Sequence, residues 1–274
     1  MIPVDNSSNF GYYKPNIIVK IIITITRGIG KNWFSKRVIF FLRKIAIILS
    51  EDCIDTKLFN SKLRLYTKGN VSEKRALFSP QIFEKDERDF IANMSKDNSI
   101  FIDIGSNIGL YSFSVGNIYK TFKNTKIFSI EPNPFLFERL KYNVSQNMDV
   151  PIFPREIAIM DKSGKFKLET PNENLGQSKI SDIGKHSVIA KSLIDFINDE
   201  KIESISAIKI DVEGNEENVI IPFIDKVEKN LLPSIIIIEN NYNSWKIDLI
   251  NKLSEKGYLI KNKTRMNYIL ELTI

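Results

Sequence analysis

Residues Phe101–Gly109 read Phe-Ile-Asp-Ile-Gly-Ser-Asn-Ile-Gly, and this stretch decides the fold. Its first four residues form an apolar run broken by one carboxylate, which predicts a short buried strand. The residues from Leu110 to Tyr119 carry apolar side chains at near-helical spacing and predict a helix. A strand, a tight glycine turn and a helix make up half of a βαβ unit. Ligands of open parallel sheets bind at the carboxyl ends of such strands.

The spacing of the glycines indicates the class of ligand. A dinucleotide site uses the pattern G-x-G-x-x-G, whereas this stretch has D-x-G-x-N-x-G. Asp103 lies two residues before Gly105, so both lie on the same side of the strand. A carboxylate there suits a cationic group such as an amine and would repel phosphate. An amino acid joined to a nucleoside, as in S-adenosylmethionine, fits these features; the alternative is a structural glycine pair with an acidic cap.

The composition predicts a folded protein. The chain has 274 residues, enough for one large α/β domain with an extension or for two small domains. Hydrophobic residues make up 43% and charged residues 26%, which favours a packed core over disorder. The net charge of +6 is spread along the chain as isolated lysines. It therefore permits an anionic partner without requiring one.

Cysteine usage and the apolar runs bear on the compartment. Cys53 is the one cysteine of the sequence, so an intramolecular disulfide is excluded and a reducing compartment is favoured. The first residues lack the basic region of a secretory signal. Basic residues interrupt the early apolar runs before they reach membrane-spanning length. We expect a cytoplasmic protein, with peripheral contact at the inner membrane surface as a further option.

Residues 1–80 are predicted to form an extension to a main domain over residues 81–274. A helix predicted for Ser35–Leu49 is rich in Ile and Phe. It also carries four basic residues, Lys36, Arg37, Arg43 and Lys44. Such a helix can lie on a membrane surface, or it can bury its apolar face on the domain or on a second subunit. We favour burial, the commoner fate of such helices. A short hairpin is predicted over Leu58–Thr67.

The main domain alternates strand and helix patterns, which predicts an α/β, Rossmann-like fold with a mostly parallel sheet and helices on both faces. Further strands are predicted at Lys126–Ile130, Ile152–Ile159, Ala207–Val212, Ser234–Ile238, Tyr258–Ile260 and Asn267–Leu272. Helices are predicted at Gln81–Met94, Phe135–Asn143, Glu216–Phe223 and Trp245–Lys256. The first of these helices should place Glu84 on its solvent side. The polar, glycine-containing segment Lys165–Leu193 predicts hairpins or a lid.

Two acidic sites follow predicted strands. Glu131 ends the second strand, where a carboxylate can accept hydrogen bonds from both hydroxyls of a ribose. Lys209, Asp211 and Glu213 are spaced by two, so strand alternation places all three on one side. Central parallel strands are normally apolar on both faces, and a charged stripe is costly unless paired or functional. A structural ion pair at the strand tip and a functional group both remain open.

The chain resembles the FkbM-type methyltransferases over about residues 84–262. Its segments Phe101–Gly109, Glu131–Pro134, Ala158–Gly164, Asn174–Ser178, Ser192–Asp195 and Ile208–Glu216 occur in the order seen in that family. The segment Lys209–Gly214 is the most specific of them. The resemblance implies a class I methyltransferase fold with seven strands, the last antiparallel, and S-adenosylmethionine as methyl donor. Studied members mostly methylate hydroxyl groups of sugars and natural products.

The resemblance also implies a cofactor site, residue by residue. The glycine loop would hold the methionine part through Asp103, Gly105, Ser106, Asn107 and Gly109. Glu131 would hold the ribose, with Asn133 beside it. Ile157 and Ala158 would flank the adenine. Nothing is carried over to residues 1–80, because the family motifs do not cover them.

Catalysis by such a protein is an in-line displacement at the sulfonium methyl, so alignment and exclusion of water matter most. Asp211 or Glu213 would take the hydroxyl proton while Lys209 fixes the carboxylate. The strand ending at Glu239-Asn240 should lie beside the strand ending at Asp211. The side-chain oxygens of Asp211, Glu213, Glu239 and Asn240 could also bind Mg²⁺. We favour a metal-free site, because carboxylates near a sulfonium already face a cation.

Other readings of the sequence remain. His186, the sole histidine, could act as a base at neutral pH, but a surface role is favoured. Methylation of RNA or protein is supported by the basic net charge alone, because the sequence shows no known nucleic-acid-binding module. A non-catalytic, cofactor-binding partner protein is disfavoured by the retained Asp103, Glu131 and Asp211. The expected partner is a small-molecule or glycan hydroxyl acceptor, and a homo-oligomer is an open option.

Overall fold

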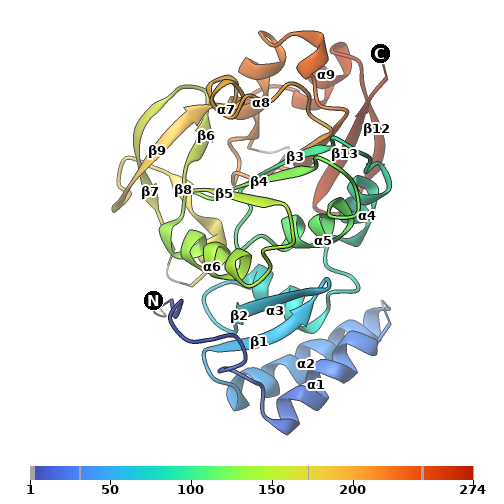
Figure 1. Ribbon diagram of the computed structural model, residues 1–274, viewed down its shortest axis with the longest axis vertical. Helices are drawn as coiled ribbons and strands as arrows, with labels where there is room; N and C mark the ends of the chain where they lie inside the picture. Colours follow the sequence, from blue (N-terminus) through green and yellow to red (C-terminus); the bar gives the residue numbers. More distant parts are fainter. Residues whose placement is uncertain (1–3, 31, 172, 242–243, 274) are drawn as a thin grey trace.

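A seven-stranded sheet forms the centre of the computed structural model, which describes residues 4–30, 32–171, 173–241 and 244–273 (Figure 1). Its strands, in spatial order, are β12 (Tyr258–Lys263), β13 (Asn267–Leu272), β11 (Ile235–Glu239), β10 (Ala207–Ile210), β3 (Ile100–Ile104), β4 (Lys126–Ile130) and β5 (Ile152–Arg155). The pairs from β11 to β5 are parallel, and β13 is antiparallel to both its neighbours. The predicted mostly parallel sheet with an antiparallel last strand is confirmed.

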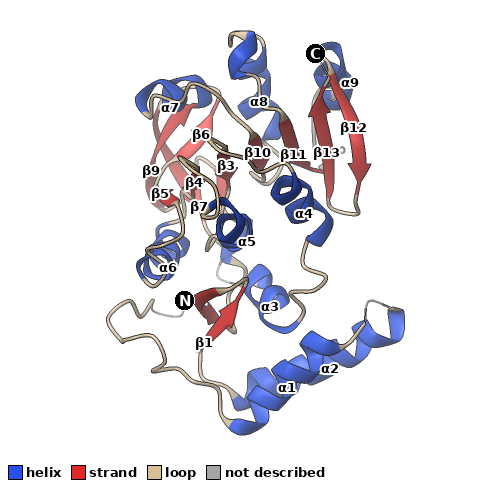
Figure 2. Ribbon diagram, turned by 45° about the vertical axis from the view of Figure 1, so that its right-hand side comes forward, coloured by secondary structure: helices blue, strands red, loops and turns tan. Residues whose placement is uncertain are grey.

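Helices cover both faces of this sheet, as predicted (Figure 2). The covering helices are α4 (Lys85–Asn93), α5 (Leu110–Tyr119), α6 (Pro134–Ser145), α7 (Leu193–Asp199), α8 (Glu216–Ile224) and α9 (Leu249–Glu255). Successive residues of β11 alternate between two apolar cores. Ile235 and Ile237 join the core that contains α5, whereas Ile236 and Ile238 join the core that contains α7, α8 and α9. A near-continuous apolar strand is therefore required at this position.

A second sheet departs from the sequence prediction. It contains β6 (Ala158–Met160), β9 (His186–Ser192), β7 (Gly164–Glu169) and β8 (Lys179–Ile180), in that order. The single strand predicted over Ile152–Ile159 is wrong: β5 ends at Arg155, and β6 pairs with β9 instead of with the main sheet. Pro154 lies in β5, at the edge of the main sheet, where the missing N–H is tolerated. The hairpins predicted within Lys165–Leu193 are confirmed by the antiparallel β7–β8 and β7–β9 pairs.

The amino-terminal region packs on the α5 side of the main sheet. It contains α1 (Ile17–Gly28), α2 (Trp33–Leu49), β1 (Cys53–Leu58), β2 (Ser61–Tyr66) and α3 (Val71–Phe78), and the β1–β2 hairpin begins before the predicted Leu58. Val19, Leu63 and Leu77 share one apolar core with Phe101 and Ile237 of the sheet. This apolar core is continuous across residue 80. The predicted division of the chain at residue 80 stays a prediction.

Helix α2 buries only part of its apolar surface. Ile39 and Ala46 are buried, as the packing prediction requires. Phe40 and Phe41 differ from that prediction, because they are 50% and 64% exposed. Among the described residues, no helix combines the length and the apolar character needed to cross a bilayer.

Candidate active site

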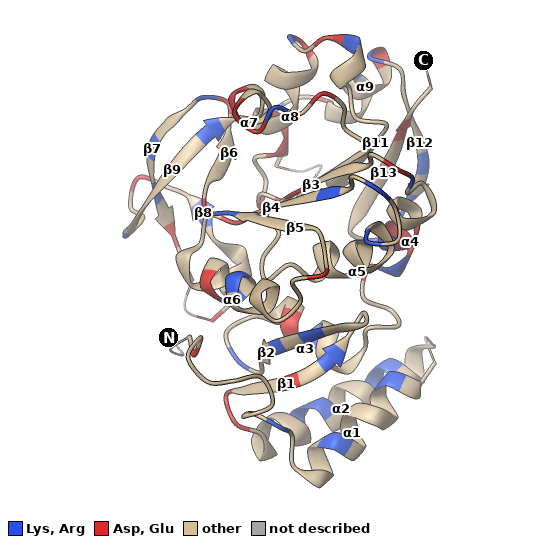
Figure 3. Ribbon diagram, viewed as in Figure 1, with Lys and Arg blue, Asp and Glu red and all other residues tan. Residues whose placement is uncertain are grey.

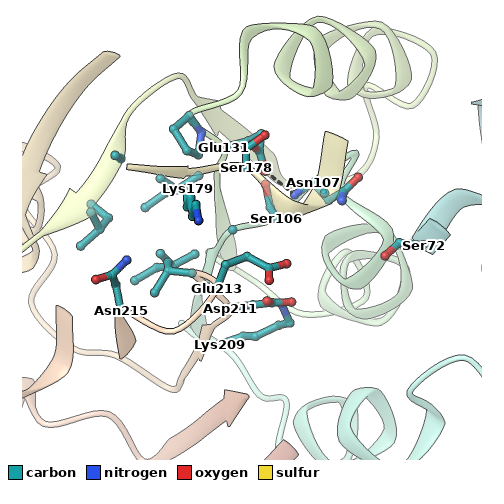
Figure 4. Close-up of a pocket in the computed structure, with 18 of the residues that line it drawn as sticks. Ser72, Ser106, Asn107, Glu131, Ser178, Lys179, Lys209, Asp211, Glu213 and Asn215 are labelled. Atoms are coloured by element: carbon teal, nitrogen blue, oxygen red, sulfur yellow. Dashed lines mark hydrogen bonds and ion pairs between the residues drawn. The ribbon is translucent and has the colours of Figure 1, made fainter. Parts of the chain in front are cut away.

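A pocket opens where β3, β4 and β10 reach their carboxyl ends (Figure 4). Its lining combines the glycine loop, Glu131, the start of β6, the segment before β8, the turn after β10 and the residues that precede α4. Figure 4 shows Lys209, Asp211 and Glu213 close together, with Glu131 across the pocket from them. The topology therefore gathers most of the residues predicted from separate segments at one sheet edge, as expected for an open α/β sheet.

The glycine loop is shaped by left-handed backbone conformations. Gly105 has φ 74° and Gly109 has φ 85°, values that only glycine adopts at little cost. A Cβ atom on Gly105 would lie 1.9 Å from the backbone oxygen of Asp211. The N–H groups of Gly105 and Ser106 both donate to the Ile130 carbonyl at 3.0 Å. The loop is thus pinned between β4 and the turn that carries Asp211, which fixes their relative position.

Gly105→Ala is expected to destabilise the protein more than Gly69→Ala does, by about 1–3 kcal/mol. Both glycines have nearly the same φ, 74° and 75°, so both substitutions carry the left-handed strain of about 1–2 kcal/mol. A Cβ on Gly69 meets nothing within 4 Å, whereas one on Gly105 meets the Asp211 backbone. Urea denaturation of the two variants measures the difference. Equal losses would show that the loop and the Asp211 turn do not pack backbone against backbone.

Glu131 is buried at the pocket wall. Its two carboxylate oxygens accept hydrogen bonds from the backbone N–H groups of Asn107, at 2.8 Å, and Asn133, at 2.9 Å. Burial raises the pKa of Glu131 to about 7, against the opposing effect of these two bonds. Each oxygen keeps a second lone pair for a ligand hydroxyl. This geometry suits the predicted ribose contact.

Asn133 and Asp103 lie behind the pocket wall rather than on it. The Asn133 side chain caps α6 by accepting from Phe135 N at 2.9 Å. Asp103 is fully buried, and its Oδ2 accepts from Ser112 Oγ at 2.7 Å. Burial raises the pKa of Asp103, while the nearby Lys209 lowers it. Among the described residues, Oδ1 of Asp103 has no hydrogen-bond partner. The predicted direct contact of Asp103 with a ligand amine stays a prediction.

All the remaining predicted cofactor residues except Gly109 line the pocket. The wall of the glycine loop is formed by Gly105, Ser106 and Asn107, and Gly109 opens α5 behind them. Ile157 and Ala158 line the pocket at the crossover between the two sheets. Their predicted contact with an adenine ring stays a prediction.

Lys209, Asp211 and Glu213 meet at the pocket, although the strand stripe predicted for them is wrong in detail. β10 ends at Ile210, so Asp211 and Glu213 lie in the turn that leads to α8. Lys209 Nζ lies 2.9 Å from Asp211 Oδ2. Burial lowers the pKa of Lys209, but Asp211, Asp103 and other carboxylates raise it more, and the net shift is upward. The lysine is therefore a fixed cation that holds the Asp211 carboxylate.

Glu84 and Tyr111 are pocket residues that sequence reasoning missed. Glu84 precedes α4 in a left-handed conformation, with φ 44°, and lines the pocket instead of facing solvent as predicted. Burial raises the pKa of Glu84, and Lys209 lowers it. Tyr111 lies two residues after Gly109, and its ring centroid is 4.9 Å from Lys209 Nζ. The position of Tyr111 just after the glycine loop could have indicated a pocket residue from the sequence. The sequence around Glu84 gives no such indication.

The amino-terminal region and the polar insertion close the pocket from one side. Ser72 at the start of α3 lines it, as do Asn174 and Lys179 of the insertion. Asn70 donates to Asn107 Oδ1 of the glycine loop at 2.6 Å, and Leu175 N donates to the Gly69 carbonyl at 2.8 Å. Residues far apart in the sequence thus meet over the glycine loop.

Glu239, Asn240 and His186 lie away from the pocket lining. β11 and β10 are parallel neighbours, as predicted, with Ile238 opposite Ile210. Burial and the nearby Asp211 raise the pKa of Glu239 to about 8. His186 begins β9, where its ring meets Phe135 edge-on with centroids 5.4 Å apart. Within the described ranges, no group of three or more His, Cys, Asp or Glu side chains is arranged to hold a metal ion.

Known proteins are similar to this chain in sequence. A family model described as the methyltransferase FkbM domain matches residues 103–260, more than half of the chain. Hexuronic acid methyltransferase AglP of Haloferax volcanii is 27% identical over 175 residues, which span 63% of this chain and 68% of that protein.

Two solved structures also match. Methyltransferase FkbM from Methylobacillus flagellatus KT matches with a TM-score of 0.47 at 13% identity, over 73% of this chain and 54% of that chain. This chain thus spans about half the length of that structure. TrmK of M. capricolum in complex with S-adenosyl-homocysteine matches with a TM-score of 0.38 at 13% identity, over 68% of this chain and 66% of that chain.

Proposed function

We propose that this chain, which belongs to the methyltransferase FkbM domain family, transfers the methyl group of S-adenosylmethionine to a hydroxyl group of a sugar or glycan precursor. The acceptor class rests on the 27% identity with a protein named a hexuronic acid methyltransferase. The observation that carries the proposal is the junction between Gly105 and Asp211, which sets a cofactor loop directly against a candidate proton acceptor.

The pocket residues fit S-adenosylmethionine. Glu131 offers free lone pairs to a ribose, and Ile157 with Ala158 offers an apolar wall to an adenine. Asp103 keeps a buried oxygen without a partner among the described residues, next to the glycine loop. A cationic methionine amine is the kind of group that this end of the site would hold, directly or through water.

The reaction would use this chain's residues for alignment and for proton transfer. Bound S-adenosylmethionine would supply a methyl group on a positively charged sulfur. Asp211 or Glu213 would accept the proton of the acceptor hydroxyl, and Lys209 would hold Asp211 in place through its 2.9 Å contact. Ser72 and the insertion that contains Lys179 would exclude water from one side. We favour the metal-free version, because the carboxylates already face a sulfonium.

Labelled S-adenosylmethionine tests the proposal directly. The full chain is incubated with separate pools of cell glycans, nucleotide sugars, tRNA and protein. Label in a sugar hydroxyl is expected, whereas label in tRNA or protein would replace the acceptor class. Absence of transfer to every pool, together with tight cofactor binding, would favour a non-catalytic partner protein. Loss of activity in EDTA that Mg²⁺ restores would overturn the metal-free version.

Glu131→Ala is expected to weaken S-adenosylmethionine binding by about 1.5–3 kcal/mol, since the variant loses charge-assisted hydrogen bonds to the ribose. Titration calorimetry measures the affinity, with Glu138→Ala as a matched control on the exposed face of α6. Unchanged affinity would remove Glu131 from the cofactor site. Tighter binding of NAD than of S-adenosylmethionine would remove the cofactor assignment as a whole.

The cytoplasm is the compartment that we propose. Cys53 is buried as a free thiol, and no other cysteine is present in the sequence to pair with it. A reducing environment is the simplest setting for such a chain.

A further inference from the structure

The α1–α2 helical hairpin presents a wide apolar face to solvent. In α2, Trp33, Phe34 and Ile48 are 66%, 69% and 80% exposed, and in α1 Ile17 and Ile21 are 68% and 51% exposed. The two helices pack against each other at the end of the molecule opposite α8 and α9 (Figure 1). Contiguous exposed apolar surface of this kind marks a site of interaction with a partner or a membrane.

The charges on this hairpin have a single sign. Every charged residue of α1 and α2 is basic, and Figure 3 shows blue and no red on these two helices. Lys20, Lys36, Arg37 and Lys44 are exposed. Arg27 is turned inward, because it donates to the Leu77 carbonyl at 2.9 Å. The outer face is therefore both apolar and cationic.

Basic and aromatic side chains share one stripe of α2. Positions 33, 37, 40, 44 and 48 recur at spacings of three and four, so they lie on the same side of the helix. The Arg37 guanidinium carbon lies 4.0 Å from the Trp33 ring centroid, and Lys44 Nζ lies 4.7 Å from that of Phe40. Long basic side chains that lie along aromatic rings can keep their charge in the headgroup layer while the rings enter the lipid boundary.

We propose that the outer face of α1 and α2 docks on a membrane surface that carries anionic lipids. A second copy of this chain is the other candidate for such a face, but it would bring like charges against one another. Anionic headgroups instead neutralise the exposed basic residues, and the apolar side chains gain burial in the same step. Charge complementarity therefore favours an anionic membrane surface over a second copy of this chain as the partner.

The docking face adjoins a groove that leads toward the pocket. Lys36 of α2 lines this open groove together with Arg75 and Arg265. Phe83 and Glu84 line both the groove and the pocket. Docking through α2 would therefore place the groove at the edge of the membrane surface. The docking proposal itself does not depend on which acceptor is methylated.

Vesicle co-sedimentation tests the docking. The full chain is mixed with vesicles of phosphatidylcholine alone or of phosphatidylcholine with phosphatidylserine. We expect partition onto the anionic vesicles that falls as salt screens the charges, because the Debye length drops from about 10 Å at 0.1 M to about 3 Å at 1 M. Lys36→Glu/Arg37→Glu/Lys44→Glu should weaken the partition more than about tenfold. Phe34→Ser/Phe41→Ser should weaken it as well, since the apolar contact is lost.

A matched variant separates a defined face from general electrostatic attraction. Lys162→Glu/Lys165→Glu/Lys167→Glu makes the same change in net charge at exposed positions before and within β7, far from α1 and α2 (Figure 1). This control should keep most of its partition, and thermal melts should confirm that every variant is folded. Equal loss in the control, or no partition on anionic vesicles, would overturn the proposal. Concentration-dependent dimerisation that Phe34→Ser/Phe41→Ser abolishes would assign the face to a second copy.

Discussion

Asp211→Asn is expected to lower kcat for methyl transfer by about 10²–10⁴-fold, with little change in the affinity for S-adenosylmethionine. The amide cannot accept the hydroxyl proton as a carboxylate does. The substitution would also leave Lys209, which is 3% exposed, without the negative charge that now lies 2.9 Å from its Nζ. Steady-state kinetics with the identified acceptor measure kcat, and calorimetry measures cofactor affinity.

Glu213→Gln distinguishes the role of Glu213 in proton transfer from that of Asp211. Burial, with Asp211 and Glu216 nearby, raises the pKa of Glu213 to about 7. A proton acceptor must be ionised, so kcat should rise with pH through about 7 if Glu213 is the base, and the variant should lose this rise. Glu203→Gln, at an exposed position, is the matched control. If both Asp211→Asn and Glu213→Gln keep near-normal turnover, Lys209 and Asp211 are a structural ion pair.

The parts of the site that the sequence predicted are those encoded within one local segment. The strand, turn and helix around Gly105 follow from a short pattern, because apolar spacing and left-handed glycine conformations are local properties. β3 and α5 accordingly end and begin close to the predicted residues. Glu131 was found the same way, as an acidic residue at the end of a strand.

The parts that were missed depend on contacts between distant segments. Glu84 lines the pocket because its backbone turns left-handed just before α4, and nothing in its local sequence requires that turn. Ser72 reaches the pocket because α3 packs near the glycine loop through Asn70. The run Ile152–Ile159 is apolar on both sides of the crossover, so its pattern does not reveal that one strand ends and another sheet begins.

The amino-terminal region shows the same limit of local patterns. The predicted α2 was found from its apolar spacing, but which of its apolar residues would be covered depended on α1 and on the sheet. Arg64 offers no local signal either. Arg64 is 1% exposed, and its guanidinium donates to Asp55 and to the carbonyl groups of Asp5, Ser8 and Asn9. These bonds hold the first described residues against the β1–β2 hairpin.

Arg139→Met is expected to lower the free energy of unfolding by about 3–5 kcal/mol, because it leaves the buried Glu73 carboxylate without its cation. Arg139 Nη1 of α6 lies 2.6 Å from Glu73 Oε2 of α3, and these side chains are 1% and 0% exposed. Lys141→Met is the matched control on the same helix, since its pair with Glu138 is exposed and worth about 0–1 kcal/mol.

The double variant Glu73→Gln/Arg139→Met sharpens this test of how the amino-terminal region is joined to the main domain. The side-chain amide introduced at position 73 would still accept from Tyr66 N, as Glu73 does at 2.9 Å, but would carry no buried charge. The double variant should therefore recover much of the stability that Arg139→Met loses. Urea denaturation should show one transition for residues on both sides of residue 80, shifted in the single variant. A separate transition for the amino-terminal region, with the main domain unaffected by Arg139→Met, would instead support two independent units divided near residue 80.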